Sequence, residues 1–140
     1  MDLVAANRYM TIATADGDGK PWVSPVWFAP WGRERLLWVS DPAARHSQNI
    51  AARAEVAIVI FDSTVAVGAA EALYLDATAE QLAGAELEAG IAEFSAHSLS
   101  GGLEPWSLED VTAPAKHRLY SATVRASWAL GPGDERIPLA

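Results

Sequence analysis

The stretch KPWVSPVWFAPW, Lys20 to Trp31, carries three of the chain's six tryptophans and three of its eight prolines. Its composition otherwise predicts a β-strand from about Pro21 to Ala29. Pro25 has no N–H to donate to a neighbouring strand, so we expect this strand at a sheet edge or at a bulge. Trp22 and Trp27 are an odd number of residues apart, so their side chains should lie on opposite faces of the strand. Such a strand leaves backbone groups free for a planar aromatic ligand, although large aromatics also fill barrels and dimer interfaces by area alone.

The segments on either side of this stretch predict two more strands. YMTIATA (Tyr9–Ala15) alternates and ends at DGDGK, a strong turn signal, so it forms a hairpin with the tryptophan-rich strand. PWGRER then turns the chain into LLWVS (Leu36–Ser40). We therefore expect three antiparallel strands in succession.

Two helices and three further strands are expected after them. Asp41 as N-cap and Pro42 at the first helical position predict a short helix over SDPAARHSQNIAARAE. A longer helix is expected in GAELEAGIAEFSAHSL, ending at Gly101-Gly102, with its start left open by a possible capping box at Thr78 and Gln81. The strands are VAIVIF (Val56–Phe61), EALYLDATAEQL (Glu71–Leu82) and YSATVRASWAL (Tyr120–Leu130).

Three finer expectations concern these later elements. The strand Val56–Phe61 is continuously apolar, which indicates cover on both faces. The strand Tyr120–Leu130 alternates throughout, which predicts one dry face and one wet face. Ser107 with Asp110 forms a capping box for a short helix or turn.

The fold class that follows is mainly β with inserted helices, in a single domain spanning residues 1–140. Six strands in one small domain favour a closed or partly open antiparallel barrel, since closure removes sheet edges. A hydrophobic content of 51% supplies enough apolar surface for one core.

Composition and charge restrict the classes of partner that the protein can be expected to bind. Ten basic and eighteen acidic residues give a net charge of −8, which disfavours nucleic acid. A local pair of cations could still hold a small anion. The chain has no cysteine, no apolar stretch of the roughly 20 residues that span a bilayer and no recognisable leader, so we expect a cytoplasmic protein without a membrane partner.

Few motifs of catalytic chemistry are present. The three histidines are scattered and HExxH is absent, so we expect no metal site. GxSxG, P-loop and GxGxxG patterns are also absent, and no side chain is expected to act as a catalytic nucleophile. Arg45 and His46 lie early in the predicted short helix, where a phosphate is favoured; the alternative is that Arg45 pairs with Asp41 or Glu55.

The order TIATADGDGKPWVSPVWF, LLWVSDPAARHSQNIAARAEVAIVIF, LYLDATAEQL and HRLYSATVRASWAL resembles the pyridoxamine 5′-phosphate oxidase-like FMN-binding split barrels, from about Asn7 to the end. The resemblance implies a six-stranded antiparallel split β-barrel that forms a homodimer. It implies FMN at the subunit interface and hydride transfer to or from a small-molecule substrate, with the substrate and the reductant unspecified.

The resemblance also implies a set of cofactor-binding residues. A strand segment along the flavin corresponds to Ser24, Pro25, Val26 and Trp27, and a ligand contact on the next strand to Ser40. The phosphate-binding Arg-Lys pair corresponds to Arg45 and His46. Residues approaching the flavin from the second subunit correspond to Trp106 and Arg118.

The chain departs from the family pattern at several of these positions. Ser24 and Ala29 stand where the family stretch is basic, and His46 replaces a lysine. Two alternatives therefore accompany the FMN oxidoreductase: a reductase that uses a deazaflavin coenzyme, and a non-catalytic module that binds flavin or haem.

Overall fold

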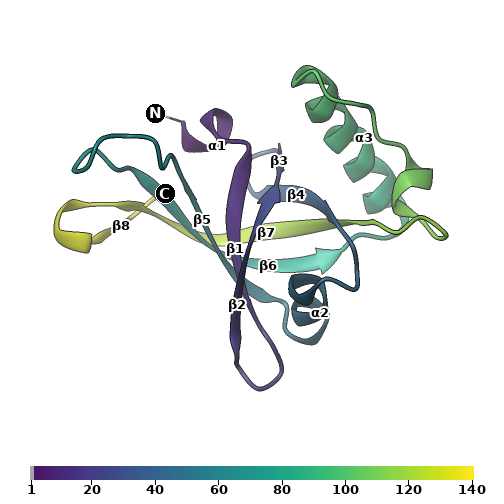
Figure 1. Ribbon diagram of the computed structural model, residues 1–140, viewed down its shortest axis with the longest axis horizontal. Coiled ribbons are helices and arrows are strands. Elements are labelled where there is room, and N and C mark those ends of the chain that lie inside the picture. Colours follow the sequence, from purple (N-terminus) through teal and green to yellow (C-terminus); the bar gives the residue numbers. More distant parts are fainter. Residues whose placement is uncertain (1) are drawn as a thin grey trace.

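Alternating apolar residues build one antiparallel sheet in the computed structural model, which describes residues 2–140 (Figure 1). The strands pair in the order β2-β1-β5-β6-β7-β4-β3, with β8 added to β7. Their bounds are β1 (Tyr9–Ala15), β2 (Pro21–Trp27), β3 (Ala29–Trp31), β4 (Arg35–Ser40), β5 (Glu55–Phe61), β6 (Ala72–Gln81), β7 (Arg118–Leu130) and β8 (Arg136–Pro138).

Three helices and two short 3-10 segments flank this sheet. They are α1 (Leu3–Ala6), α2 (Arg45–Ala52), α3 (Gly84–Ser100), η1 (Leu108–Val111) and η2 (Pro132–Asp134). The expected longer helix and its end before Gly101 are confirmed. The capping box is also confirmed, because the Asp110 carboxylate accepts a hydrogen bond of 2.8 Å from the Ser107 backbone N–H. None of these helices is both long and apolar enough to cross a membrane.

The sheet curls so that its two terminal strands come together. β2 and β3 stand at opposite ends of the pairing order, yet only Phe28 separates them in the chain. The result is an antiparallel split barrel that is open between β2 and β4, which confirms the expected mainly β fold class (Figure 1). Residues 2–140 form eight strands rather than the expected six, because the tryptophan-rich strand divides in two and the C-terminal residues add β8.

The division at Phe28 corrects the predicted strand Pro21–Ala29. The Phe28 side chain is buried, and its N–H donates to the Arg8 carbonyl, so the chain bends inward here. The Lys20 carbonyl accepts from the Asp16 N–H on the same edge. Even-numbered residues of β2 therefore pair with β1, while Pro21 and Pro25 point their ring nitrogens away from it. The expectation that Pro25 lies on an edge strand is confirmed.

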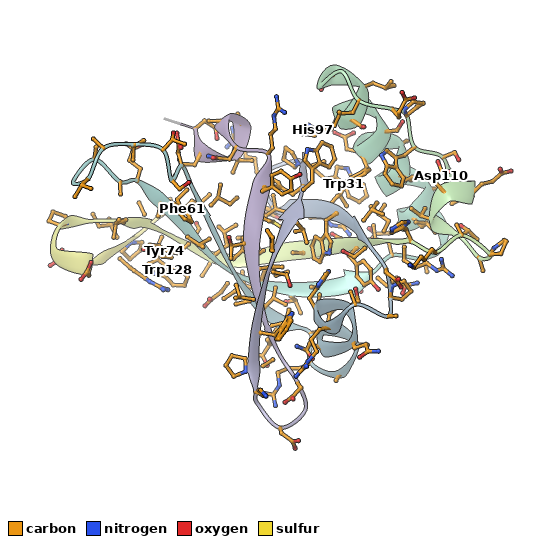
Figure 2. The ribbon with its side chains drawn as sticks, in the orientation of Figure 1. Trp31, Phe61, Tyr74, His97, Asp110 and Trp128 are labelled. Carbon is orange, nitrogen blue, oxygen red and sulfur yellow. The ribbon has the colours of Figure 1, made fainter. Side chains whose placement is uncertain are left out.

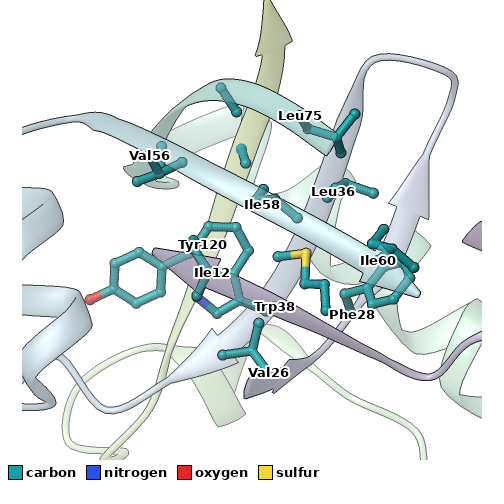
Figure 3. Close-up of a cluster of buried hydrophobic side chains, with 14 of the residues drawn as sticks. Ile12, Val26, Phe28, Leu36, Trp38, Val56, Ile58, Ile60, Leu75 and Tyr120 are labelled. Carbon is teal, nitrogen blue, oxygen red and sulfur yellow. The ribbon is translucent and has the colours of Figure 1, made fainter. Parts of the chain in front are cut away.

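Two apolar clusters surround the sheet. The larger cluster fills the barrel and includes Ile12, Val26, Trp38, Ile58 and Tyr120 (Figure 3). The smaller cluster joins α3 to the outside of β3, β4 and β7. At Gly90 the helix approaches so closely that a Cβ would lie 2.9 Å from Leu82 Cδ1.

Expectations for two strands are wrong within a single chain. β5 alternates, so its inner residues are buried while Phe61 on the outer face remains 45% exposed. β7 is buried on both faces near its start, because α3 covers the face opposite the barrel interior. A bulge then leaves Arg125 without a partner on β6 and switches the faces, so Trp128 lies outward beside Tyr74 (Figure 2).

The predicted start of the short helix is also wrong. α2 begins at Arg45 with Ala44 as N-cap. Residues 41–44 form a turn instead, in which the Asp41 carboxylate accepts from the Ala43 N–H at 2.9 Å and the Asp41 carbonyl accepts from the Ala44 N–H. Proline suits the second position of such a turn as well as it suits the first turn of a helix, so the sequence signal is shared by both structures.

Candidate functional site

Buried polar side chains gather where α2 packs against the barrel. Thr14 on β1, Ser40 on β4, and Ser47 and Asn49 on α2 are all buried. The Asn49 side-chain amide donates a 3.0 Å hydrogen bond to Thr14 Oγ1. The Ser47 hydroxyl is buried without a hydrogen-bond partner among residues 2–140. Buried polar groups normally have partners, so this end of the molecule is built differently from an apolar core.

A hydrogen bond joins the end of β4 to the first turn of α2. Ser40 Oγ lies 2.8 Å from His46 Nε2, and His46 is half-buried. Burial lowers the pKa of His46 from its usual 6.5 because it penalises the charged imidazolium. In the unliganded chain His46 is therefore mainly neutral at pH 7.

Arg45, the first residue of α2, is exposed next to this pair. Its guanidinium lies 4.9 Å from the centroid of the Trp22 ring on β2. Within the described part of the chain the guanidinium has no hydrogen bond or ion pair, and Asp41 pairs instead with Lys116 at 3.6 Å. The alternative in which Arg45 is tied to Asp41 or Glu55 is therefore not what the structure contains.

The turn between β1 and β2 lies close to the same arginine. Hydrogen bonds from the Lys20 and Asp18 N–H groups lower the pKa of the Asp16 carboxyl, and the positive charges of Arg45 and Lys20 lower it further. At the other end of α2, Arg53 donates to the carbonyls of Asp16 and Gly17. Arg53 is thus occupied in holding the turn, whereas the Arg45 guanidinium faces solvent.

β2 supplies an open edge beside Arg45. Val26 is buried in the barrel core at 7% exposure, and its N–H and carbonyl point to Met10 on β1, so neither its side chain nor its backbone faces the open edge. Trp22 and Ser24 share its parity, and Trp22 is 42% exposed. Because even residues bond to β1 and Pro25 has no N–H, the donors on the open edge are those of Val23 and Trp27.

Two of the expected site residues pack under α3 instead. The ring of Trp27 meets Phe94 edge-on with centroids 5.1 Å apart, and Trp106 meets the other side of Phe94 at 5.6 Å. The Trp106 N–H donates to Ser95 Oγ at 2.9 Å. The side chains of Trp27 and Trp106 are thus part of the α3 cluster, at the opposite end of β2 from Trp22.

Arg118 lies near Ser40 through the backbone. The two residues are register partners on β7 and β4. Its guanidinium, however, donates to the carbonyls of Ala115 and His117, each at 2.7 Å. In one chain the structure therefore brings together Ser40, Arg45 and His46, with Ser24 on the same face of β2 as the Trp22 ring that Arg45 contacts, while the Arg118 side chain holds its own loop.

Three residues contribute to this region without having been predicted as site residues: Trp22, Thr14 and Asn49. Trp22 stands two residues before Ser24, so the period of a strand could have placed both on one face. Asn49 follows His46 by three residues, a spacing that places both on the same face of a helix. The bond between Thr14 and Asn49 joins residues far apart in sequence, and no local pattern indicates it.

A separate cavity of about 530 Å³ lies next to this region. It shares Thr14 with the polar cluster and is lined further by Glu55, Asp76, Thr78 and Arg125. Arg125 donates to Thr78 Oγ1 at 2.8 Å. Among residues 2–140 no group of three or more His, Asp or Glu side chains could hold a metal ion.

Comparisons with known proteins place this geometry in a family. A family model described as pyridoxamine 5′-phosphate oxidase matches residues 1–129. No curated protein matches the chain.

Several solved structures share the fold. HutZ, the haem storage protein of Vibrio cholerae, is 22% identical with a TM-score of 0.68; the match covers 89% of this chain and 86% of that chain. A haem-binding protein of Mycobacterium smegmatis is 19% identical with a TM-score of 0.77, covering 99% and 55%. An F420 reductase is 22% identical with a TM-score of 0.59, covering 85% and 87%. At such identities these likenesses show a common fold alone.

Proposed function

Because the chain belongs to the pyridoxamine 5′-phosphate oxidase family, we propose that it is an FMN-binding oxidoreductase that acts on a small molecule. The observation that carries the proposal is the exposed Arg45 guanidinium over Trp22, next to the Ser40–His46 pair and the open edge of β2. In this proposal two copies of the chain form a homodimer and hold the flavin between them.

The residues at the start of α2 fit a phosphate. Arg45 can bind two phosphate oxygens at once with its planar guanidinium, which contacts the Trp22 ring and makes no hydrogen bond or ion pair among residues 2–140. The N–H groups at the start of α2 add partial positive charge. The Ser40 and Ser47 hydroxyls supply further neutral donors nearby, and Ser47 has no other partner in the described chain.

The open edge of β2 fits the edge of a flat ring. Pro25 and Trp27 present their carbonyls there, together with the Trp27 N–H, while the two outward prolines prevent another strand from occupying the same place. A bound flavin would supply hydride transfer through its N5 atom, with the protein providing position and electrostatics. Arg45 would orient the ligand through its phosphate, and the β2 edge would align the ring.

The outer face of the sheet supports the homodimer. Phe61 and Tyr9 are large and exposed there, and Tyr74 lies on the same face with the Arg136 guanidinium 4.2 Å from its ring centroid (Figure 2). Residues 56–61 of β5 are apolar on the outward face as well as on the inward face, and a second copy would cover the outward side chains. We keep Trp106 and Arg118 as the contacts expected from the second subunit.

Cofactor content tests the proposal directly. The freshly purified protein is examined by visible absorption, and the protein freed of ligand is then titrated with FMN and with riboflavin, which lacks the phosphate. The expected result is a flavin spectrum or stoichiometric FMN binding, with riboflavin bound much more weakly. Failure to bind either flavin in the dimeric protein would overturn the proposal.

A second candidate is a module that carries its ligand without catalysis, or a reductase with a deazaflavin coenzyme. The observation favouring it is that the first turn of α2 offers one permanent cation, Arg45, beside a His46 whose pKa is lowered, whereas FMN phosphate carries close to two negative charges. Haem and the deazaflavin coenzyme are the ligands to test, because two of the structures that share the fold are named as a haem storage protein and an F420 reductase. Titration with haem and with the deazaflavin coenzyme distinguishes them.

A further inference from the structure

His46 is placed where a permanent cation would be the simpler choice for holding phosphate. It follows Arg45 in the first turn of α2, it is half-buried, and its Nε2 atom lies 2.8 Å from Ser40 Oγ. Burial lowers its pKa, and no opposite charge offsets this effect. In the unliganded site the His46 imidazole is therefore mainly neutral, and a nearby negative charge would favour its protonation.

Ser40 is the partner that permits both protonation states. A hydroxyl can donate a hydrogen bond to the bare Nε2 of a neutral imidazole, and it can accept one from the Nε2–H of an imidazolium. The same 2.8 Å contact thus survives a change of charge with only a rotation of the hydroxyl hydrogen. In the neutral tautomer with a bare Nε2, Nδ1 already carries the ring proton; charging the ring adds a proton at Nε2, so that both nitrogens donate.

On the helix that carries His46 the neighbouring charge is Arg45, and Arg53 bonds the turn between β1 and β2. Arg118 opposes Ser40 across the strands and bonds carbonyls of its own loop. The carboxylates of Asp16 and Asp41 are already engaged, by backbone N–H groups and by Lys116 respectively.

We infer that His46 takes up a proton when a ligand with a phosphate tail binds, so that the site becomes doubly cationic only when it is filled. The inference rests on the proposed function, because it assigns the ligand's phosphate to the Arg45–His46 turn. A phosphate beside the imidazole supplies the negative charge that stabilises the imidazolium and offsets its burial. Empty, the site avoids placing two cations side by side.

The inference predicts how affinity depends on pH. Between the pKa of His46 in the free protein and its higher value in the complex, each bound ligand brings one proton with it. The dissociation constant should then rise about tenfold per pH unit as the pH increases. A lysine at the same position would remove this dependence, because its ammonium is charged throughout the neutral range.

Calorimetry measures the proton directly. FMN is titrated into the dimeric protein at pH 7.5 in buffers of different ionisation enthalpy, and the slope of the observed enthalpy gives the protons taken up. A phosphate monoester has a second pKa of about 6, so the ligand itself exchanges few protons at this pH. The expected uptake approaches one proton for the unaltered protein and is near zero for H46K and H46Q.

The variants separate the possible failures. H46K should bind FMN at least as tightly as the unaltered protein and show no pH dependence between pH 6.5 and 8.5. H46Q should bind more weakly and also lack the dependence. FMN binding without proton uptake in the unaltered protein, or with the same uptake in H46K, would overturn the inference while leaving the proposed function intact. Absence of FMN binding in all three proteins would overturn both.

Discussion

The replacement Arg45→Ala tests the central contact of the proposed site. Among residues 2–140 the guanidinium contacts the Trp22 ring, 4.9 Å from its centroid, and attracts the Asp16 carboxylate without a hydrogen bond or ion pair, so its removal should do little to the fold. A cation–π contact at an exposed position is worth about 0.5–1 kcal/mol. The free energy of unfolding of the unliganded protein should therefore fall by no more than this amount.

The effect on ligand affinity should be larger. A hydrogen bond to a charged group contributes about 1.5–3 kcal/mol, which corresponds to a roughly 10- to 150-fold rise in the dissociation constant. Quenching of flavin fluorescence during titration measures this constant. Riboflavin should bind the variant and the unaltered protein equally, because the lost contact is to the phosphate.

Arg53→Ala is the matched control. It removes the same charge from the residue that caps the C-terminal end of α2, but Arg53 donates to the carbonyls of Asp16 and Gly17 rather than facing the proposed ligand. We expect its FMN affinity to change by less than about threefold, since an exposed charge at a distance is screened by salt. Equal weakening by both replacements, or none by Arg45→Ala, would refute the reasoning.

Three further predictions concern assembly, the α3 cluster and pH. Phe61→Asp places a charge on the outer face of β5 and should convert a dimer to a folded monomer in light scattering; an unchanged mass would remove this face from the interface. Phe94→Ala empties the space between Trp27 and Trp106 and should lower the free energy of unfolding in urea by about 3–5 kcal/mol, whereas a loss below 1 kcal/mol would contradict this packing. Because burial lowers the pKa of His46, the unfolded chain binds protons first as the pH falls below about 6.5, so unliganded stability should decline there, and less in H46Q. An equal loss of unfolding free energy in the unaltered protein and in H46Q between pH 7.5 and 5.5 would contradict this prediction.

Local sequence patterns predicted most of the fold because most of its signals are local. Asp16-Gly17 and the alternation of Tyr9–Ala15 determine a hairpin within about twenty residues, and Pro25 correctly marks an edge strand. The errors occur where a distant element decides the outcome. The bulge at Arg125 depends on pairing with β6, and burial of the outer face of β7 near its start depends on α3.

The candidate site was predictable in part for the same reason. Arg45 and His46 are adjacent in sequence, and a turn before a helix is a recognisable place for an anion. No sequence pattern indicates which side chains contact Arg45 and His46. The bond from Ser40 to His46 and the placement of Trp22 under Arg45 depend on how β2, β4 and α2 meet in space. The side chain of Trp27 lies under α3 for the complementary reason, since Phe94 is sixty-seven positions further along the chain.

The tryptophan-rich strand explains why the barrel stays open next to α2. An edge strand with all its outward N–H groups is a template for another strand, and β4 is close enough to compete for it. Pro21 and Pro25 occupy alternate outward positions and remove the donors that such pairing needs. The open edge is therefore protected against strand addition, while the remaining carbonyls and the Trp27 N–H are still available to a small molecule. Because Phe28 then turns the chain inward, the opening is confined to the length of β2, and Arg45 stands over it at Trp22.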